Sequence, residues 1–519
     1  MRSRSESAAP VRPDLETLEA DERRRTMYAH IAGVAKRTAP SMRRLTGSLA
    51  WVAAVAMLTL ASAAAHAEEA ITPDSTDTVA AVVQTTAAPE APTVQTTTLI
   101  PGLAPSPQSN AVGPQFFRPR DARGLNVFEP PKTDNQPFEG KKLFWGFAFA
   151  QQFQGLKHTN TAQPKMVVVN ALPVNANQLV GIGNGFNNAT ANLYLDAQIA
   201  RGVRVALTSY LSSRHHQETW VKDGYIQIDA SPIDRAALNK LMQYMTLRVG
   251  HFEVNYGDAH FRRSDNGNAF FNPFVGNLIM DAFTTEIGAE ATVRAHGLMA
   301  MATVTGGEIH GQVQKPNERS PSYLAKLGFD RQLTQATRVR LTGSLYTNKK
   351  AVNNTLYSGS RAGSRYYSVL ENAQSTENAQ AWSGDLQPGF RNQVTAWVIN
   401  PFVKYRGLEL FGNIEQAKGK ATAETSQRTW TQYAGEGIYR LCDEKLYFGS
   451  RYNVANGTLA GITGDLKVER IQAAAGWFVT SNLLAKAEYV RENYRNFPAT
   501  DIRNGGRFDG FMVEGVVTF

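Results

Sequence analysis

The stretch Phe511-Met512-Val513-Glu514-Gly515-Val516-Val517-Thr518-Phe519 decides the fold. Its odd-numbered positions hold apolar or small residues with an aromatic residue at each end, whereas Glu514 and Thr518 occupy even-numbered positions. Successive side chains of a β-strand point to opposite faces, so this period of two predicts a strand with one apolar, aromatic face. The other face is mixed, because it combines these polar residues with Met512 and Val516.

The same alternation recurs from residue 142 onward; Val205 and Leu207, for example, alternate with Arg204. We predict strands at 142–153, 190–200, 202–212, 219–230, 243–254, 280–291, 297–305, 322–332, 337–346, 394–405, 407–416, 430–441, 444–453, 466–478, 482–493 and 507–519. Short turns alternate with longer polar loops between these sixteen segments, and the longest loop is 347–393. An even strand count with this asymmetry is typical of an all-β, transmembrane antiparallel up-and-down β-barrel. A soluble β-sandwich would not need the asymmetry.

One long apolar run lies near the N-terminus. Arg43 and Arg44 precede the apolar run 49–60, and Ala65-His66-Ala67 matches a small-residue cleavage site. This order predicts a long N-terminal prefix plus a Sec signal peptide over 1–67, with cleavage after Ala67. A retained membrane anchor is the alternative. Export through the Sec pathway together with a barrel predicts the cell outer membrane of a Gram-negative bacterium.

Two regions follow the signal peptide. Residues 68–137 contain eleven prolines and are rich in Ala, Thr, Gln and Ser. Such a composition cannot bury a core, so we predict a disordered periplasmic linker there and the barrel over 138–519. Within the barrel, 231–242 begins with Ser-Pro and carries apolar residues at helical spacing, which predicts a short helix at a turn.

Composition excludes several classes of function. The chain has 54 basic and 45 acidic residues, and residues 1–67 hold 10 and 6 of them, so the remainder has 44 and 39 and a net charge of +5. This balance gives no support for nucleic-acid binding. Cys442 is the only cysteine, which excludes an intrachain disulfide. The sequence has no nucleophile elbow, P-loop or H-E-x-x-H motif, so we expect no enzyme activity and no cofactor.

The C-terminal strand resembles the assembly signal of bacterial outer-membrane barrels, through Phe511, Val513, Val517 and Phe519. Over about 142–519 the chain resembles the outer-membrane porin superfamily, with a likeness to phosphate-selective (O/P-type) porins in architecture and length. The resemblance implies outer-membrane lipid and the barrel-assembly machinery as partners. It also implies small polar or anionic solutes as cargo, and a homotrimer.

The densest polar cluster lies in 250–268, which falls in the third predicted outer loop along the chain. In general porins the third loop folds into the lumen and narrows it, so the resemblance makes this a candidate constriction. The candidate residues are Asp258, His260, Arg262, Arg263 and Asp265. The two arginines would attract anions. One alternative is a structural loop packed inside the barrel or on a neighbouring subunit. Another is a metal site of His251, His260 and Asp258, although their spacing supports none of the common metal motifs.

Charged residues on the strands must face the lumen, because a charge facing lipid costs about 2–4 kcal/mol at the midplane. The candidates that line the lumen are Arg204, Arg248, Glu286, Glu290, Arg338, Arg340, Glu409, Glu436, Arg440, Lys486 and Glu488. A barrel of this size leaves a channel, so we expect passive diffusion of small polar solutes or ions with an anion bias. The alternative is a non-conducting structural or adhesive barrel that uses its long outer loops. Whether 250–276 blocks or only narrows the bore would separate the two.

Overall fold

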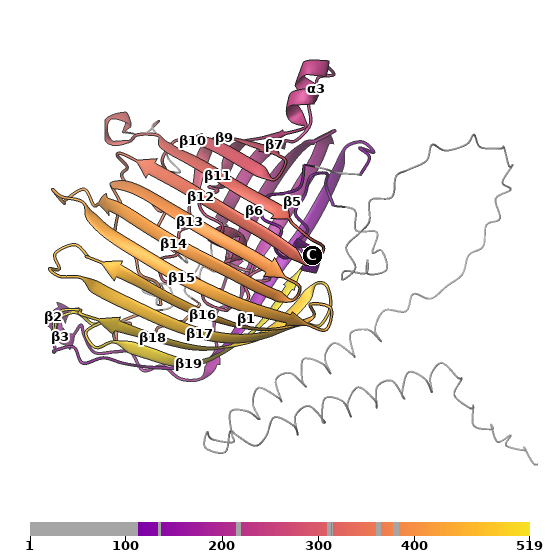
Figure 1. The fold of residues 1–519 in the computed structure, drawn as a ribbon. Coiled ribbons are helices and arrows are strands. Elements are labelled where there is room, and N and C mark those ends of the chain that lie inside the picture. Colours follow the sequence, from indigo (N-terminus) through magenta and orange to yellow (C-terminus); the bar gives the residue numbers. More distant parts are fainter. Residues whose placement is uncertain are drawn as a thin grey trace, which may run out of the picture. The chain divides into compact units, whose positions relative to one another are not determined.

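The computed structural model describes residues 113–132, 136–213, 220–308, 313, 315–359, 365–376 and 384–519. Sixteen of the strands within them form one closed antiparallel barrel (Figure 1). Their bounds are β1 Lys142–Thr159, β5 Thr190–Ala200, β6 Val203–Ser212, β7 Trp220–Ile228, β8 Met245–Glu253, β9 Thr285–Ala295, β10 Leu298–Thr305, β11 Ser322–Gln332, β12 Thr337–Asn348, β13 Gln393–Tyr405, β14 Leu408–Lys420, β15 Arg428–Leu441, β16 Leu446–Gly457, β17 Leu466–Phe478, β18 Leu483–Arg495 and β19 Arg507–Thr518. The predicted all-β barrel of sixteen strands is confirmed. The predicted signal peptide over 1–67 lies outside the described residues.

The barrel closes through β1. This strand pairs with β5 along one edge and with β19 along the other, where Phe153 lies opposite Val513. All other neighbours in the barrel wall are consecutive barrel strands. Closure matters because a sheet without an edge satisfies every backbone hydrogen-bonding group in the wall, which the hydrocarbon core of a membrane requires.

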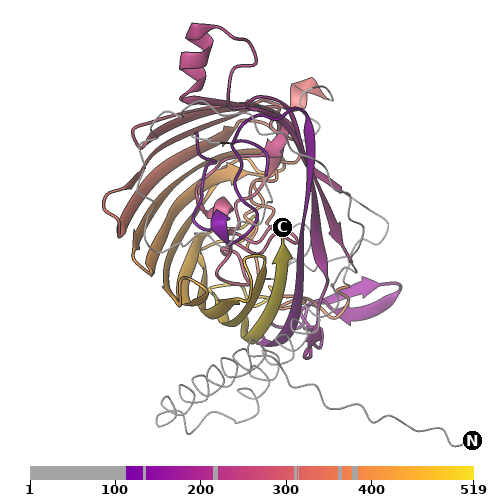
Figure 2. The same cartoon turned by 90° about the vertical axis from the view of Figure 1, so that its right-hand side faces the viewer.

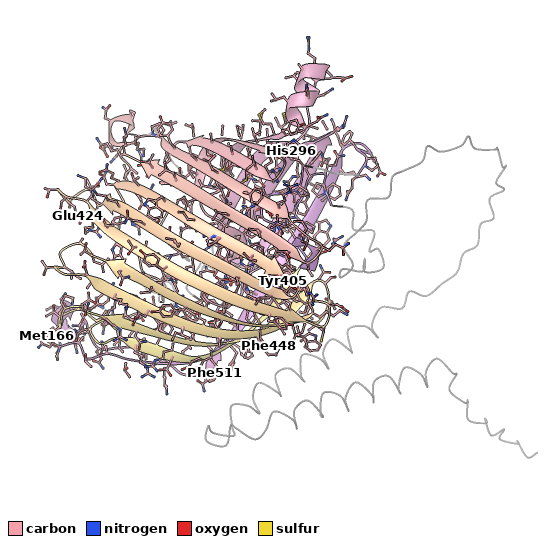
Figure 3. All side chains as sticks on the ribbon, in the orientation of Figure 1. Met166, His296, Tyr405, Glu424, Phe448 and Phe511 are labelled. Atoms are coloured by element: carbon pink, nitrogen blue, oxygen red, sulfur yellow. The ribbon has the colours of Figure 1, made fainter. Side chains whose placement is uncertain are left out.

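Alternation along the strands separates an apolar outer face from a polar inner one. Leu327, Phe448 and Ile471 are 67%, 57% and 53% exposed on the outer face. Their neighbours Lys326 and Arg470 are fully buried on the inner face. Figure 3 marks Phe448 and Phe511 among the side chains of this surface. The outer face is therefore suited to lipid, and the polar groups point into the bore.

The two ends of the barrel differ. At the turn end, strands are joined by short connections such as Arg406-Gly407, where Arg406 has a φ of 51°, and Cys442–Lys445. At the loop end, the connections 160–189, 254–284 and 349–392 are long. The first of these loops holds three strands outside the sequence prediction, namely β2 Met166–Val169, β3 Leu172–Asn175 and β4 Gly185–Phe186. The strands β2 and β3 form a hairpin, and β4 pairs with β1.

The predicted helix at 231–242 is present but shorter. Helix α3 covers Ala236–Met242 and projects from the barrel at the connection between β7 and β8 (Figure 1). Residues 231–235 turn instead, because the Ser231 hydroxyl pairs with the backbone of Ile233 and Arg235 is extended. None of the helices in the described part of the chain is long and apolar enough to cross a membrane.

The bore of the barrel is filled by other parts of the same chain. A large cluster of buried apolar side chains joins residues of the loops, such as Ile279, Leu356 and Phe390, to inward residues of the wall. A second cluster is built around Phe270 and Phe274 in the same way. The hydrophobic core of the protein thus lies inside the barrel, where an open pore would hold water.

Candidate functional site

Three segments lie inside the bore and define the candidate site. They are the N-terminal segment, residues 113–132; the inner loop, residues 254–284 between β8 and β9; and the described residues of the long loop between β12 and β13, which are 349–359, 365–376 and 384–392. Figure 2 shows the N-terminal segment, drawn in indigo, within the ring of strands. The candidate site is therefore the contact between these segments and the polar inner face of the wall.

The inner loop contains all five candidate constriction residues and runs through the interior. Phe274 and Ile279 of this loop are fully buried, as is Asp258. Inward amides of the wall bind its backbone: Asn453 accepts a 2.7 Å hydrogen bond from the Ile279 amide, and Gln432 accepts one of 2.7 Å from Met280. These contacts also explain why β9 begins at Thr285 and not at the predicted residue 280, since 280–284 belong to the loop.

Asp258 is the most highly connected of the five candidates. Its carboxylate accepts two 2.8 Å hydrogen bonds from the guanidinium of Arg340 and lies 2.8 Å from the ammonium group of Lys326. Thr342 donates a further hydrogen bond of 2.8 Å. Burial raises the pKa of Asp258, but the charges of Lys326 and Arg340 outweigh it and lower the pKa below its ordinary value. Asp258 is therefore an ionised anchor for the inner loop.

Arg262 lies at the end of the short helix η2, Ala259–Arg262, and points between two wall carboxylates. Its terminal nitrogens lie 3.6 Å from Glu409 and 3.5 Å from Glu436. One of them also donates a 2.6 Å hydrogen bond to the Asn126 side-chain oxygen. At 5% exposure of its side chain, Arg262 is a buried, neutralised cation and presents no free charge to a passing solute.

Arg263 is neutralised in the same way. It donates hydrogen bonds of 2.8 and 2.5 Å to the two oxygens of Asp281, also in the inner loop. Asp265 lies 3.3 Å from Arg263 and 2.5 Å from Lys222 of β7. A two-bond contact between guanidinium and carboxylate is the strong form of this ion pair, so Arg263 stabilises the inner loop's own shape.

His260 packs between a polar side chain of the inner loop and a carboxylate at the end of strand β8. Its two ring nitrogens lie 3.3 Å from Glu253 and 3.0 Å from the Asn255 side-chain oxygen. Burial lowers the pKa of His260 below its ordinary value, although the neighbouring Glu253 acts in the opposite direction. The metal site considered from the sequence gains no support, because the described residues contain no group of three or more His, Cys, Asp or Glu side chains suited to a metal ion.

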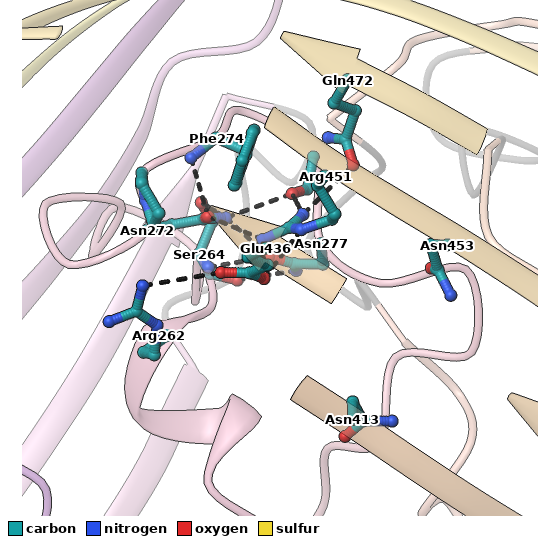
Figure 4. Close-up of polar contacts among 12 residues, drawn as sticks. Arg262, Ser264, Asn272, Phe274, Asn277, Asn413, Glu436, Arg451, Asn453 and Gln472 are labelled. Carbon is teal, nitrogen blue, oxygen red and sulfur yellow. Dashed lines mark hydrogen bonds and ion pairs between the residues drawn. The ribbon is translucent and has the colours of Figure 1, made fainter. Parts of the chain in front are cut away.

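The second half of the inner loop is held by a network that Figure 4 draws. Arg451 of β16 donates hydrogen bonds of 2.8 Å to the Gly276 carbonyl oxygen and to Glu436, and its guanidinium lies 4.1 Å from the ring centre of Phe274. Asn277 contacts the backbone of Ser264 in both directions, with distances of 2.8 and 2.9 Å. The chain is thus folded back on itself inside the bore.

Lys486 and Glu488 hold the same part of the loop from β18. Lys486 donates to the carbonyl oxygens of Ala269, Asn272 and Phe274 at 2.9, 3.0 and 2.9 Å. Glu488 accepts hydrogen bonds from the Val275 amide at 2.8 Å and from the Tyr366 hydroxyl of the long loop at 2.6 Å. These two candidates face inward as the alternation predicts, and they contact protein.

The other lumen candidates also face inward. Nine of the eleven are buried to 6% exposure or less: Arg204, Glu286, Glu290, Arg340, Glu409, Glu436, Arg440, Lys486 and Glu488. Arg248 and Arg338 are half-buried, with side chains 19% and 25% exposed. Their partners are mostly other charges, for example Arg440 with Glu409 at 2.7 Å and Arg204 with Asp196 at 2.8 Å. Their role in lining a conducting path stays a prediction.

The N-terminal segment was predicted to belong to a disordered linker, and that prediction is wrong for residues 113–132. Phe128 is 2% exposed, and its ring lies 5.4 Å from that of Phe402 and 5.8 Å from that of Phe261. Glu129 lies 2.8 Å from Arg340 and 3.3 Å from Lys326, which are also the partners of Asp258. Apolar burial and ion pairing offset the conformational entropy that a linker would otherwise keep.

Glu129, Phe128 and Asn126 are functional candidates that the sequence analysis missed. Asn126 donates a 2.5 Å hydrogen bond to Glu409 and accepts one from Arg262, so it joins the wall to the inner loop. One signal could have found them: residues 68–115 contain no aromatic residue, whereas 116–128 contain three phenylalanines. The compositional break falls near residue 116, before the predicted boundary at 137.

Three cavities lie along one side of the bore. The central cavity, next to Arg262, Arg263 and Glu436, has a volume of about 20 Å³, which is room for one water molecule. A second, of about 40 Å³, lies between Glu129, His260 and Arg248. The third, which we call the vestibule, has a volume of about 590 Å³ and lies between the N-terminal segment and the β9–β10 turn. Among the described residues, the two cavities near the centre of the bore are thus small, and the largest of the three opens at the turn end.

Comparisons with solved structures find proteins with barrels of this class, all at low sequence identity. Outer-membrane OmpT of Vibrio cholerae aligns over 74% of this chain and 99% of its own, with a TM-score of 0.42 and 10% identity. An anion-selective porin from Comamonas acidovorans covers 73% and 100%, with a TM-score of 0.45 and 8% identity. The outer-membrane channel DcaP of Acinetobacter baumannii covers 73% and 98%, with a TM-score of 0.42 and 8% identity. No family model and no curated protein sequence matches the chain.

Proposed function

We propose that this protein is an outer-membrane channel of the porin type, closed in this conformation by its N-terminal segment and inner loop. The observation that carries the proposal is the ion-paired joint of Glu129, Asp258, Lys326 and Arg340, which ties both segments to the inner face of the wall. Its four members come from two segments and two strands, so a shift of either segment would break it. The closed barrel and its apolar outer face favour placement in a membrane.

Small polar solutes are the proposed cargo, because the inner face of the wall is lined by charges of both signs. An anion bias cannot come from Arg262 and Arg263 as they stand, since each is neutralised by carboxylates. An anion preference of the open channel would therefore come from other residues along the bore. The vestibule at the turn end holds arginines in a more open setting.

The first experiment is single-channel recording of residues 68–519 in planar bilayers. The wild type should be closed or open only briefly. The double variant Phe128→Ser, Glu129→Gln should give long openings, because it removes an apolar contact and an ion pair that hold the N-terminal segment in the bore. Glu139→Gln is the matched control, because Glu139 forms an exposed pair with Lys142. Steady wild-type openings equal to those of the variant would refute closure by the segment.

A second candidate function is a non-conducting structural or adhesive barrel. The filled bore favours it, and so does the apolar tip of the β2–β3 hairpin at the loop end, where Met166, Val168 and Leu172 are 62%, 75% and 66% exposed. Exposed apolar side chains grouped in this way mark interaction surfaces. If the wild type and the variant are both silent although folded, this candidate takes first place.

A further inference from the structure

The vestibule is a built cavity with walls from three parts of the chain. The N-terminal segment contributes Phe117, Val127 and Phe128, which form an apolar wall. Strand β9 contributes Arg294 and strand β10 contributes Met299, and strands β11 and β12 contribute Asp330, Arg338 and Arg340. Its volume of about 590 Å³ falls within the range of small-molecule sites.

Most charges of the vestibule are already paired. Arg338 donates hydrogen bonds of 2.8 and 2.7 Å to the two oxygens of Asp330. Arg340 binds Glu129 and Asp330 at 2.8 and 3.0 Å, besides Asp258 deeper in the bore. These pairs satisfy both carboxylates of the vestibule, Glu129 and Asp330, and leave neither of them available to a further cation.

Arg294 is the exception. Its guanidinium group makes no hydrogen bond or ion pair with any residue that the structure describes, and its Nε atom is buried without a partner. The side chain lines the vestibule and also the 40 Å³ cavity beneath the inner loop, so it stands at the neck between the two. The two terminal nitrogens of Arg294 are not buried, so they are the donors that an anion in the vestibule can reach.

We infer that the vestibule binds a small organic anion, a monocarboxylate with an apolar body, through Arg294. The planar guanidinium matches a carboxylate with two parallel hydrogen bonds, and Arg294 is the guanidinium still free to form them. The wall of Phe117, Val127 and Phe128 would cover the apolar body. A polyanion fits less well, because the paired carboxylates Glu129 and Asp330 line the same space.

This site deepens the proposed function by naming a solute class, but binding there does not require that the channel opens. The two ideas can therefore fail separately. A protein that binds the anion and stays silent in bilayers even as the Phe128→Ser, Glu129→Gln variant would refute the channel alone. A protein that conducts but shows no binding would refute the anion site alone.

The test is isothermal titration of the folded barrel in detergent micelles with hexanoate as the probe. Hexanamide lacks the charge and acetate lacks the apolar body, and both should bind at least about tenfold more weakly. Arg294→Gln should weaken hexanoate binding about tenfold or more, and Arg294→Lys should lie between the two, because it keeps the charge and loses the planar pair of donors.

Arg331→Gln is the matched control, because Arg331 is an exposed arginine near the turn end of β11 and lines no part of the vestibule. Circular dichroism and heat-modifiable migration on gels check that each variant is folded, and the Arg294→Lys variant keeps the test decisive if Arg294→Gln folds poorly. Equal hexanoate affinity in the wild type and in a folded Arg294→Gln variant would overturn the inference. No hexanoate binding by the wild type, or equal binding of hexanamide, would overturn it as well.

Discussion

The carboxylate of Asp258 in the inner loop accepts two 2.8 Å hydrogen bonds from the guanidinium of Arg340 on strand β12. The sequence predicted Asp258 as a constriction residue and Arg340 as a residue that lines the lumen, but it did not predict that the two would form a pair. Their pairing fixes the inner loop to the wall. The inner loop is therefore held inside the barrel by specific ionic contacts and not only by packing.

Asp258→Asn is expected to loosen the inner loop. The substitution leaves the buried Lys326 with Glu129 and the buried Arg340 with Glu129 and Asp330 as charged partners, and breaking a buried ion pair on one side costs about 3–5 kcal/mol. The variant should unfold at a lower temperature and be cut faster by protease within 254–284. Asp443→Asn, in an exposed turn, is the control and should behave like the wild type. Equal protease sensitivity of the two variants would show that Asp258 is not an anchor.

Phe128→Ala is expected to release the N-terminal segment. The ring packs against Phe261 and Phe402 and lies under the Arg340 guanidinium at 4.3 Å, and truncation of a buried phenylalanine costs about 3–5 kcal/mol. Mass spectrometry after brief trypsin treatment should detect faster cleavage at Arg120 or Arg123. Phe138→Ala is the control, since Phe138 is 37% exposed. An unchanged cleavage rate would mean that other contacts hold the segment.

Acidification is expected to loosen the bore in two steps. Burial lowers the pKa of His260, so below its ordinary value near 6.5 the unfolded chain takes up a proton that the folded loop resists, and stability falls as the pH drops through that range. Burial raises the pKa of Glu129, but Lys326 and Arg340 lower it further, so its stabilisation is complete above about pH 4.5 and is lost as the pH falls below that. Thermal unfolding from pH 8 to pH 3 measures both steps.

Two variants assign the steps. His260→Gln should flatten the stability profile between pH 7 and pH 5, and Glu129→Gln should flatten it below about pH 4.5 while lowering stability at pH 7. If both profiles keep the wild-type shape, the pH response comes from other groups.

Arg262→Ala is expected to shift ion preference in any conducting state toward cations. The substitution leaves Glu409 and Glu436 with less positive charge around them, although Arg440 and Arg451 remain paired with these two carboxylates. The reversal potential under a salt gradient measures the shift. Arg406→Ala, in a turn outside the bore, is the control and should not change it. An unchanged reversal potential in both variants would place the ion path away from Arg262.

Leu327→Arg is expected to impair assembly of the barrel in lipid. Leu327 lies at the middle of β11 on the outer face, and arginine costs about 2–4 kcal/mol at the midplane of a bilayer. Leu333→Arg, just beyond the end of the same strand, should cost about 0–1 kcal/mol. Folding yields into lipid vesicles compare the two. Equal yields would argue against a membrane around this part of the barrel.

The strands were predictable because one physical constraint acts on every second residue. An outward apolar face and an inward polar face leave the pattern of 322–332 and 466–478 unmistakable, and β11 and β17 have these bounds. The orientation of Arg340, Glu409 and Lys486 follows from the same rule. The partners of these three side chains do not follow from the rule, because they depend on how the N-terminal segment, the inner loop and the long loop fold inside the barrel.

The ordered position of the N-terminal segment could not be predicted from its composition. Its prolines and the polar residues before it resemble a linker, and only a few side chains, chiefly Phe128 and Glu129, give it a fixed place. Those side chains have no periodic pattern, since the segment forms no strand and only the short helix η1, Ala122–Gly124. The segment is ordered by contacts with residues 133 to 283 positions later in the chain, from Phe261 to Glu409.

The pairing of β1 with β19 has a consequence for the order of folding. Phe153 meets Val513 only after nearly the whole chain has been made, and contacts so distant in sequence form slowly. The N-terminal segment precedes β1, yet Phe402, Glu409 and Arg340 surround it only once the wall exists. The first of these parts to be synthesised thus docks only after the wall has formed, and a barrel caught before that moment would have a complete wall without the N-terminal segment in its bore.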